Sequence, residues 1–185
     1  MKRYLGAGMV PAMAALVFGM NANAAMGEEK MIERAPVIEA PVEAEEPKDL
    51  PDLVEDYKDG FTLDEQGKCL ANAIYFEARG ESLEGQLAVA DVVINRTDSS
   101  KYPSTWCNVI KQKAQFSFVK DRKFPKVRDM ESWETAKAVA RIAIEDAHEI
   151  VPEGVLWYHA DYVSPRWRHN LNEVAKVGVH IFYEA

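Results

Sequence analysis

Hydrophobic residues recur at helical spacing near the middle of the chain. Leu70, Ala73 and Ile74 follow one another at steps of three and one, which places them on one face of a helix. The pattern predicts a helix over about 63–78, and Gly80 follows as the residue that ends it.

Two polar positions mark the starts of neighbouring helices. Thr62 and Glu65 have the three-residue spacing of a capping box, and Ser82 can cap a second helix. The second helix has the sequence LEGQLAVADVVIN, which is apolar on nearly every side. We therefore expect it to lie buried at the centre of the fold.

The pattern changes from helical to strand-like toward the C-terminus. A short helix is expected over 106–111, a brief strand over 115–119, and an amphipathic helix within 131–150. A Pro-Glu-Gly turn then leads into a β-rich run within 151–163, and a second strand-like run covers 176–184. This order predicts an α+β fold with a helical lobe followed by a small β-rich C-terminal lobe.

The first 24 residues have the layout of a secretory signal peptide. Lys2 and Arg3 precede an apolar run that ends in Ala-Asn-Ala, and cleavage is expected after Ala24. An uncleaved membrane anchor is the alternative, but the run is short for a bilayer span and contains Pro11. We expect removal of segment 1–24, a periplasmic or secreted product, and no stable membrane span afterwards.

Composition divides the rest of the chain into a linker and one domain. Segment 25–59 carries 12 acidic residues against four basic ones, with four prolines and no aromatic residue before Tyr57. Such a segment cannot bury enough apolar surface to fold, so we expect an acidic, disordered linker. The nearly neutral remainder, 60–185, is long enough for one domain with a proper core.

One part of the domain is strongly basic. Segment 101–128 contains eight basic residues and a single acid, Asp121, with aromatic residues between them. The segment could suit an anionic polymer, although a solvated basic surface explains the same pattern. Nucleic acid is not expected as a partner, because the chain is exported and its net charge is −8.

Glu77 stands on the apolar stripe of the first helix, where the pattern calls for a core residue. Burial penalises an ionised carboxylate, and the negative end of the helix dipole adds to the penalty, so the pKa of Glu77 is expected to be raised. An acid that keeps its proton near neutral pH suits general-acid cleavage of a glycosidic bond. The alternative is a structural glutamate satisfied by an arginine such as Arg96.

The cysteines permit a crosslink, and the histidines do not form a metal motif. Cys69 and Cys107 can form one disulfide in an oxidising compartment, and two buried thiols are the alternative. The four histidines show neither HExxH nor comparable ligand spacing. No metal or other cofactor is therefore expected.

Five sequence blocks in a fixed order carry a family resemblance. They are AIYFEARGESLEGQLAVADVVINR, YPSTWCNVI, AQFSF, WYHADYVSPRW and VGVHIFYE. Together they resemble the SleB/CwlJ cell-wall hydrolase family over about 69–183. The resemblance implies a lysozyme-like α+β domain, a lytic transglycosylase that cuts peptidoglycan glycan strands between N-acetylmuramic acid and N-acetylglucosamine. It also implies that the catalytic acid is the first glutamate of EARGE, which is Glu77 here.

The resemblance further implies a substrate groove. Its expected sugar-binding residues are Gln115, Phe116, Tyr158, His159, Tyr162 and Trp167. A structural role is an equal alternative for His159 and for His180. For Glu81 a capping or surface role is expected rather than that of a second catalytic carboxylate.

The chain departs from the family pattern in two places. Some secreted relatives carry cysteines where this chain has Ala114 and Lys120, which leaves Cys69 and Cys107 as the only partners for each other. The spore-germination members also carry a separate wall-binding module, whereas a linker is expected before this domain. Wall remodelling, or lysis by a phage-encoded enzyme, is therefore expected instead of a spore role.

Two other functions stand as alternatives. A zinc amidase would cut the peptide stem of the same polymer, and a non-catalytic module would only bind the wall. The histidine spacing argues against the first, and the presence of Glu77 argues against the second. In each case peptidoglycan is the expected partner, and the protein is expected to be a monomer.

Overall fold

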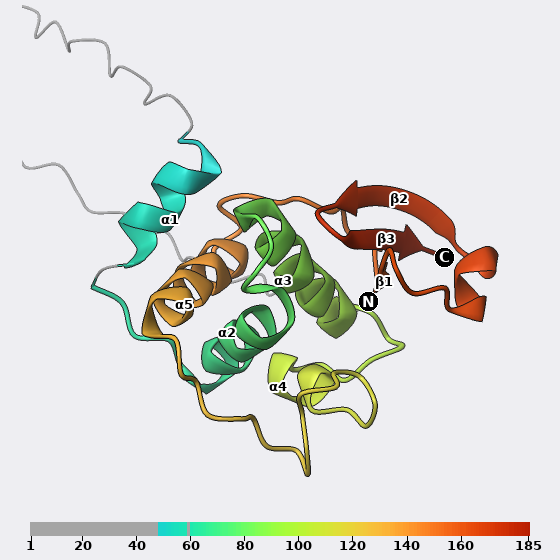
Figure 1. Ribbon diagram of the computed structural model, residues 1–185, viewed down its shortest axis with the longest axis horizontal. Coiled ribbons are helices and arrows are strands. Elements are labelled where there is room, and N and C mark those ends of the chain that lie inside the picture. The colour runs from blue at the N-terminus through green and yellow to red at the C-terminus, as the bar shows by residue number, and fades with distance from the viewer. Residues whose placement is uncertain (1–47, 59) are drawn as a thin grey trace, which may run out of the picture. The chain divides into compact units, whose positions relative to one another are not determined.

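The computed structural model describes residues 48–58 and 60–185. The predicted signal peptide and positions 25–47 of the predicted linker lie outside the described residues. Helices come first and a small antiparallel sheet follows, which confirms the α+β class (Figure 1). The elements are α1 Leu50–Lys58, α2 Glu65–Ala78, α3 Leu83–Asp98, α4 Trp106–Ile110, α5 Met130–Ile144, β1 Trp157–Ala160, the 3-10 helix η1 Arg166–Asn170, β2 Asn172–Val177 and β3 His180–Glu184.

Side-chain caps fix the starts of the long helices. Asp64 is the N-cap of α2, and its carboxylate accepts a hydrogen bond of 2.7 Å from the backbone N–H of Gly67. The expected capping box at Thr62 is therefore wrong by two positions, because aspartate satisfies a free N–H at least as well as threonine. The expected cap of α3 is confirmed, since the Ser82 hydroxyl accepts from the N–H of Gly85 at 3.3 Å.

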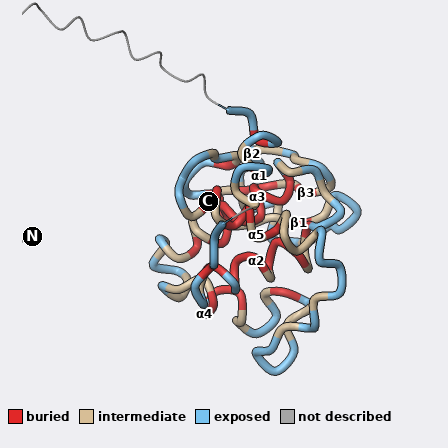
Figure 2. Tube along the Cα trace, turned by 90° about the vertical axis from the view of Figure 1, so that its left-hand side faces the viewer, coloured by how far each residue is buried: buried red, intermediate tan, exposed pale blue. Residues whose placement is uncertain are grey.

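Helix α3 lies at the centre of the helical lobe, as its sequence predicts. Nine successive residues, 85–93, are buried, and the helix packs against both α2 and α5. Figure 2 shows the buried positions running through these three helices. Within the described residues no helix combines the length and apolar character needed to span a membrane.

Three polar side chains of α3 hold the segment that leads into the sheet. Asp91 accepts hydrogen bonds from the backbone N–H groups at positions 150 and 151, at 2.8 and 3.2 Å. One turn later Asn95 donates to the carbonyl groups at 152 and 155, at 3.0 and 3.3 Å. Arg96 donates from Nε to the carbonyl at 156, at 2.8 Å. Helix α3 thus fixes where strand β1 begins.

Helix α1 corrects the linker prediction. Segment 50–58 is a helix rather than disordered chain, and it packs against α5 with Leu50 and Val54 only 4% and 2% exposed. Leu50, Leu53, Val54 and Tyr57 fall at helical spacing, so one apolar stripe can be buried despite the acidic composition. Pro51 fits because the first turn of a helix has no need of its N–H.

The sheet has the strand order β1-β3-β2, with antiparallel pairing throughout. The expected single strand over 176–184 is wrong, because the chain reverses at Gly178 and forms a β2–β3 hairpin. Gly178 adopts a φ of 56°, which a two-residue hairpin loop can require at its first position. Phe182 of β3 and Val92 of α3 share a small apolar cluster that seats the sheet on the helical lobe.

The expected strand over 115–119 is also wrong. The segment forms consecutive turns, and the only pairing near it is an isolated bridge between Lys120 and Lys123. Ala114, Asp121 and Arg122 adopt left-handed backbone conformations on either side of it. These reversals prevent the extended backbone that a strand needs.

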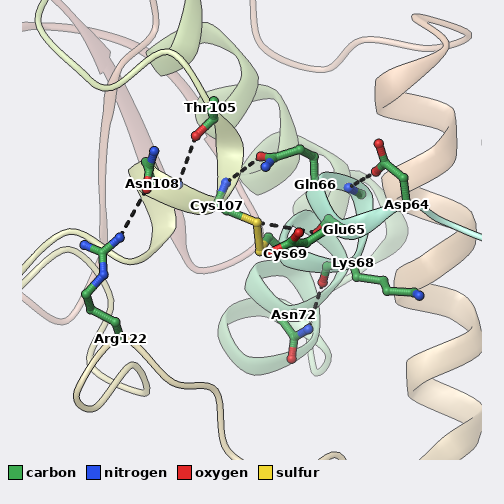
Figure 3. Close-up of a disulfide and its surroundings, with 11 residues drawn as sticks. Asp64, Glu65, Gln66, Lys68, Cys69, Asn72, Thr105, Cys107, Asn108 and Arg122 are labelled. Atoms are coloured by element: carbon green, nitrogen blue, oxygen red, sulfur yellow. Dashed lines mark hydrogen bonds between the residues drawn. A yellow bond between two sulfur atoms is a disulfide. The ribbon is translucent and has the colours of Figure 1, made fainter.

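A disulfide joins Cys69 of α2 to Cys107 of α4 (Figure 3). Both cysteines are buried, and their Cα atoms are 5.2 Å apart. The side-chain oxygen of Gln66 accepts a hydrogen bond of 3.0 Å from the backbone N–H of Cys107. Helix α2 is thereby tied to α4, which leads into the turn-rich segment.

Candidate active site

A cavity of about 350 Å³ lies between the helical lobe and the sheet. Its walls come from the last turn of α2, from α3, from positions 115 and 117, and from β1 with the residues beside it. The turn at 179–180 completes the lining. The carboxylate of Glu77 lies in this cavity together with most of the side chains expected to bind sugar.

Glu77 occupies the last turn of α2 and is half-buried. Burial raises the pKa of its carboxyl above the usual range, and a hydrogen bond from Tyr158 and the positive charge of Arg96 only partly oppose the rise. The Tyr158 hydroxyl donates to Glu77 Oε1 at 3.4 Å, a long hydrogen bond. The site therefore favours a protonated carboxyl while holding groups that support the ionised form.

Arg96 is buried close to Glu77 but does not form an ion pair with it. No carboxylate of the described residues lies within 4.0 Å of its guanidinium, and its Nη1 atom is buried without a partner. The guanidinium carbon instead lies over the rings of Tyr102 and Tyr158, at 5.3 and 5.8 Å from their centroids. The simple alternative of a structural Glu77–Arg96 salt bridge does not describe this geometry.

Tyr158 stands on β1 with its hydroxyl aimed at Glu77. Burial and the negative charge of Glu77 raise the pKa of Tyr158 well above its usual value, so the phenol keeps its proton. Its ring packs against His180 and Phe182 of β3, with centroids 5.2 and 5.6 Å apart. The sheet thus holds a permanent hydrogen-bond donor beside the carboxyl.

The two cavity histidines have different surroundings. His159 has both ring nitrogens engaged, with Nδ1 at 2.9 Å from the carbonyl oxygen of Ala160 and Nε2 at 3.0 Å from the hydroxyl of Tyr183. Because a carbonyl oxygen can only accept, Nδ1 donates to Ala160. His180 is 5% exposed, its Nδ1 is without a partner, and burial lowers its pKa. Both line the cavity, and His159 is also a satisfied structural histidine.

Glu81 combines a structural contact with a position in the cavity. Its Oε2 accepts a hydrogen bond of 3.1 Å from the backbone N–H of Val179 and lies against Gly178 at the hairpin turn. A side chain at Gly178 would collide with this carboxylate, so glycine serves the close approach as well as the turn. Glu81 therefore fastens the hairpin to the start of α3 and lines the same cavity as Glu77.

The structure brings together some of the expected sugar-binding residues and separates others. Gln115 and the 82% exposed Tyr162 line the cavity. Phe116 does not, because its ring is only 4% exposed and belongs to the core of the helical lobe. Trp167 lies on η1 with its ring at 71° to that of His159, at 5.5 Å between centroids, and does not line the cavity either.

Several residues line the cavity although the sequence did not assign them to the site: Arg96, Ser117, Ala160 and Val179. Ser117 follows Gln115 by two positions in AQFSF, so its place in the same block was the available signal. Arg96 was considered from the sequence only as a structural partner for Glu77, and not as a residue that lines the cavity. Among the described residues, no group of three or more His, Cys, Asp or Glu side chains is arranged to hold a metal ion.

A cell wall hydrolase family model matches residues 80–183 of the chain. Among curated proteins, the spore cortex-lytic enzyme of Oceanobacillus iheyensis is 35% identical over 116 residues, which are 61% of this chain and 39% of the relative. The spore cortex-lytic enzyme of Bacillus subtilis is 32% identical over 117 residues, 63% of this chain and 37% of the relative. The match thus spans about two fifths of the length of these curated relatives.

Two solved structures share the fold. The catalytic domain of the germination-specific lytic transglycosylase SleB from Bacillus anthracis has a TM-score of 0.57 and 31% sequence identity, and the match covers 68% of this chain and 98% of that domain. The catalytic domain of the Bacillus cereus SleB protein has a TM-score of 0.55 and 32% identity, covering 69% of this chain and 96% of that domain. The likeness therefore extends over nearly the whole of both catalytic domains.

Proposed function

The chain belongs to the cell wall hydrolase family, and from this premise we propose that it cleaves peptidoglycan glycan strands between N-acetylmuramic acid and N-acetylglucosamine, as a lytic transglycosylase. The observation that carries the proposal is a half-buried Glu77 with a raised pKa, in a cavity bounded by hydrogen-bonding side chains. The solved structure named as a lytic transglycosylase supports the reaction type.

Glu77 is the proposed general acid and then the general base. Its carboxyl protonates the oxygen that bridges the two sugars, and the bond from that oxygen to the anomeric carbon of muramic acid breaks. The muramic 6-hydroxyl attacks the same carbon and gives up its proton to the Glu77 carboxylate, which leaves a 1,6-anhydro end. The enzyme regains its starting protonation state, and water does not take part.

The surroundings of Glu77 suit both halves of this cycle. Burial favours the protonated form before the reaction, since desolvation raises its pKa. Once Glu77 has lost its proton, the Tyr158 hydroxyl and the nearby Arg96 charge stabilise the carboxylate. Arg96 forms no close ion pair with Glu77 that would keep the carboxyl ionised before the reaction.

A second carboxylate is not required, because the nucleophile belongs to the substrate and is held beside the anomeric carbon. Glu81 lines the cavity, but its Oε2 already accepts the N–H of Val179. This contact favours a positioning role for Glu81 over activation of a water molecule. It supports transglycosylation in preference to simple hydrolysis.

We infer a lysozyme-like division of labour between the two lobes. The helical lobe supplies Glu77, while β1 and its flanking residues supply Tyr158 and the exposed ring of Tyr162. Gln115 and Ser117 offer hydrogen bonds from the opposite wall. An exported enzyme acting in the periplasm or outside the cell is the corresponding proposal for location.

Digestion of purified peptidoglycan tests the proposed function. The wild-type protein is expected to release muropeptides with 1,6-anhydro ends, which mass spectrometry distinguishes from hydrated ends by the mass of one water. Release of free stem peptides would indicate an amidase instead. Products with only reducing muramic ends would indicate a hydrolase and overturn the transglycosylase step.

A further inference from the structure

A cleft of about 420 Å³ lies on α2 beside the proposed active site. We call it the basic cleft. It is lined by Tyr75, Phe76, Arg79, Pro125, Lys126, Arg128 and Asp129. The rings of Tyr75 and Phe76 provide apolar wall, and the cations come from the end of α2 and from the segment that precedes α5.

The charges of the basic cleft are only partly offset within the described residues. Arg79, Lys126 and Arg128 are exposed, and none of them lies within 4.0 Å of a carboxylate there. The Arg79 guanidinium carbon lies 4.9 Å from the centroid of the Tyr75 ring. Asp129 is the one acid, and its carboxylate caps α5 by accepting from the N–H and hydroxyl of Ser132, at 3.2 and 2.6 Å. The cleft therefore keeps a positive charge.

The basic cleft and Glu77 share the last turn of one helix. Arg79 follows Glu77 by two positions, which places their side chains about 200° apart around the axis. Phe76 lines the cleft and packs on Phe118, at 5.2 Å between centroids, next to Ser117 of the catalytic cavity. The two sites are separated by little more than the width of a helix, roughly 10 Å.

We propose that the basic cleft binds the peptide stem of peptidoglycan through its carboxylates. This proposal rests on the proposed function and deepens it, because the stem is attached to the muramic acid at the bond to be cut. A stem of about four residues reaches at most ~14 Å when extended, enough to pass around the end of α2. Small apolar side chains with free carboxylates match an aromatic wall with a cationic rim.

The proposal explains why the basic cleft carries cations that form no ion pair within the described residues. A solvated surface needs no concave apolar wall beneath its cations, whereas recognition of a peptide needs both. It also predicts a preference for substrate that carries stems. Glycan strands stripped of their peptides would fill only the catalytic cavity.

The test compares KM on soluble glycan strands that carry stem peptides with KM on the same strands after an amidase has removed the stems. Lys126→Glu is expected to raise the ratio of the first KM to the second by roughly tenfold, because a charge-assisted contact becomes a repulsion. Lys68→Glu is the matched control. Lys68 is likewise exposed, has no ion pair with any residue of 48–58 or 60–185, and lies at the other end of α2.

An unchanged ratio in Lys126→Glu, or an equal rise in both variants, would overturn the peptide-stem proposal. Arg79→Gln provides a second variant from the opposite wall of the cleft, and a rise in its ratio is expected too. The proposed function is read separately from the same digests. Wild-type protein that releases no anhydro ends from either substrate would refute transglycosylation, whatever the KM ratio.

Discussion

A single carboxyl on an apolar stripe carries most of the chemistry at the scale of residues. Sequence periodicity placed Glu77 on the buried face of α2, and the structure places it in a cavity with its pKa raised by burial. The sequence did not predict that the Tyr158 hydroxyl donates a hydrogen bond to Glu77. Tyr158 lies 81 positions away along the chain, and the sheet brings it to Glu77. The site thus needs tertiary structure to complete it.

Glu77→Gln is expected to lower the rate of glycan cleavage by about 10³ to 10⁴, near the upper range for loss of a general acid. Glutamine keeps the shape but has no proton to give to the leaving oxygen. The free energy of unfolding should stay level or rise slightly, since a partly desolvated carboxyl is replaced by a neutral amide. Quantified anhydro-muropeptides and thermal unfolding measure the two effects.

Glu65→Gln is the control for this change, because Glu65 is exposed in the first turn of the same helix. It should leave cleavage intact. A Glu77→Gln protein that unfolds several degrees earlier but still releases anhydro products would contradict the catalytic role and favour a structural one.

Tyr158→Phe is expected to move the alkaline limb of the pH dependence of kcat/KM to higher pH. The Tyr158 hydroxyl lowers the pKa of Glu77 by donating to its ionised form, so removal of the hydroxyl raises that pKa further. The rate at the optimum should fall by roughly tenfold, because the carboxylate formed during the reaction loses a donor. Phenylalanine keeps the ring that packs on Phe182.

The matched control for the hydroxyl is Tyr57→Phe. The Tyr57 hydroxyl donates to Glu145 on the surface of α1 and α5, away from the cavity. The pH profile of kcat/KM for Tyr57→Phe should coincide with that of the wild type. A Tyr158→Phe profile with an unmoved or lowered alkaline limb would show that Tyr158 does not act on the proton of Glu77.

At the scale of elements, the sequence was informative wherever an apolar stripe was long. The amphipathic α5 follows from periodicity, the buried α3 follows from a sequence that is apolar on nearly every side, and Ser82 correctly marks the start of α3. Helix α1 was missed because acidic residues and prolines outweighed a stripe of four apolar positions. The prediction of a strand at 115–119 was wrong for a different reason. Residues on both sides of the segment adopt left-handed backbone conformations, and the hydrophobic pattern of the sequence does not reveal them.

Val54→Ala tests whether α1 is part of the folded unit. Val54 is buried against the core, so the truncation should lower the free energy of unfolding by about 2 kcal/mol. Chemical denaturation of the wild type and variant measures the difference. Glu55→Ala is the control from the exposed side of the same helix. Equal stability of all three proteins would show that α1 does not contribute to the core.

At the scale of the whole domain, α3 is the element that connects the lobes. Asp91, Asn95 and Arg96 hold the segment 150–156, and strand β1 begins directly after it. Sequence periodicity marks α3 as central but cannot say what its polar side chains hold, because their partners lie about 60 positions later. The position of Tyr158 over Glu77 therefore depends on the docking of this segment.

Asp91 should make that docking sensitive to pH. Burial raises the pKa of Asp91 from 3.8 to about 6, although the two backbone N–H groups it accepts from oppose the rise. The folded state then binds the proton more tightly than the unfolded state does. The contribution of Asp91 to stability is fully present below its pKa in the unfolded state. It is lost as the pH rises through its pKa in the folded state, a loss of about 3 kcal/mol.

Asp91→Asn is expected to abolish this slope. Asparagine keeps an oxygen for the N–H groups at 150 and 151 but cannot titrate, so the difference in unfolding free energy between variant and wild type should shift in favour of the variant by about 2 kcal/mol between pH 4 and pH 7. Denaturation curves across that range measure the shift, and any constant offset from the buried amide cancels. Asp98→Asn removes the same charge at the exposed end of α3 and serves as the control. If the Asp91→Asn and wild-type stabilities stayed parallel across the range, Asp91 would not be the group that couples the docking of 150–156 to pH.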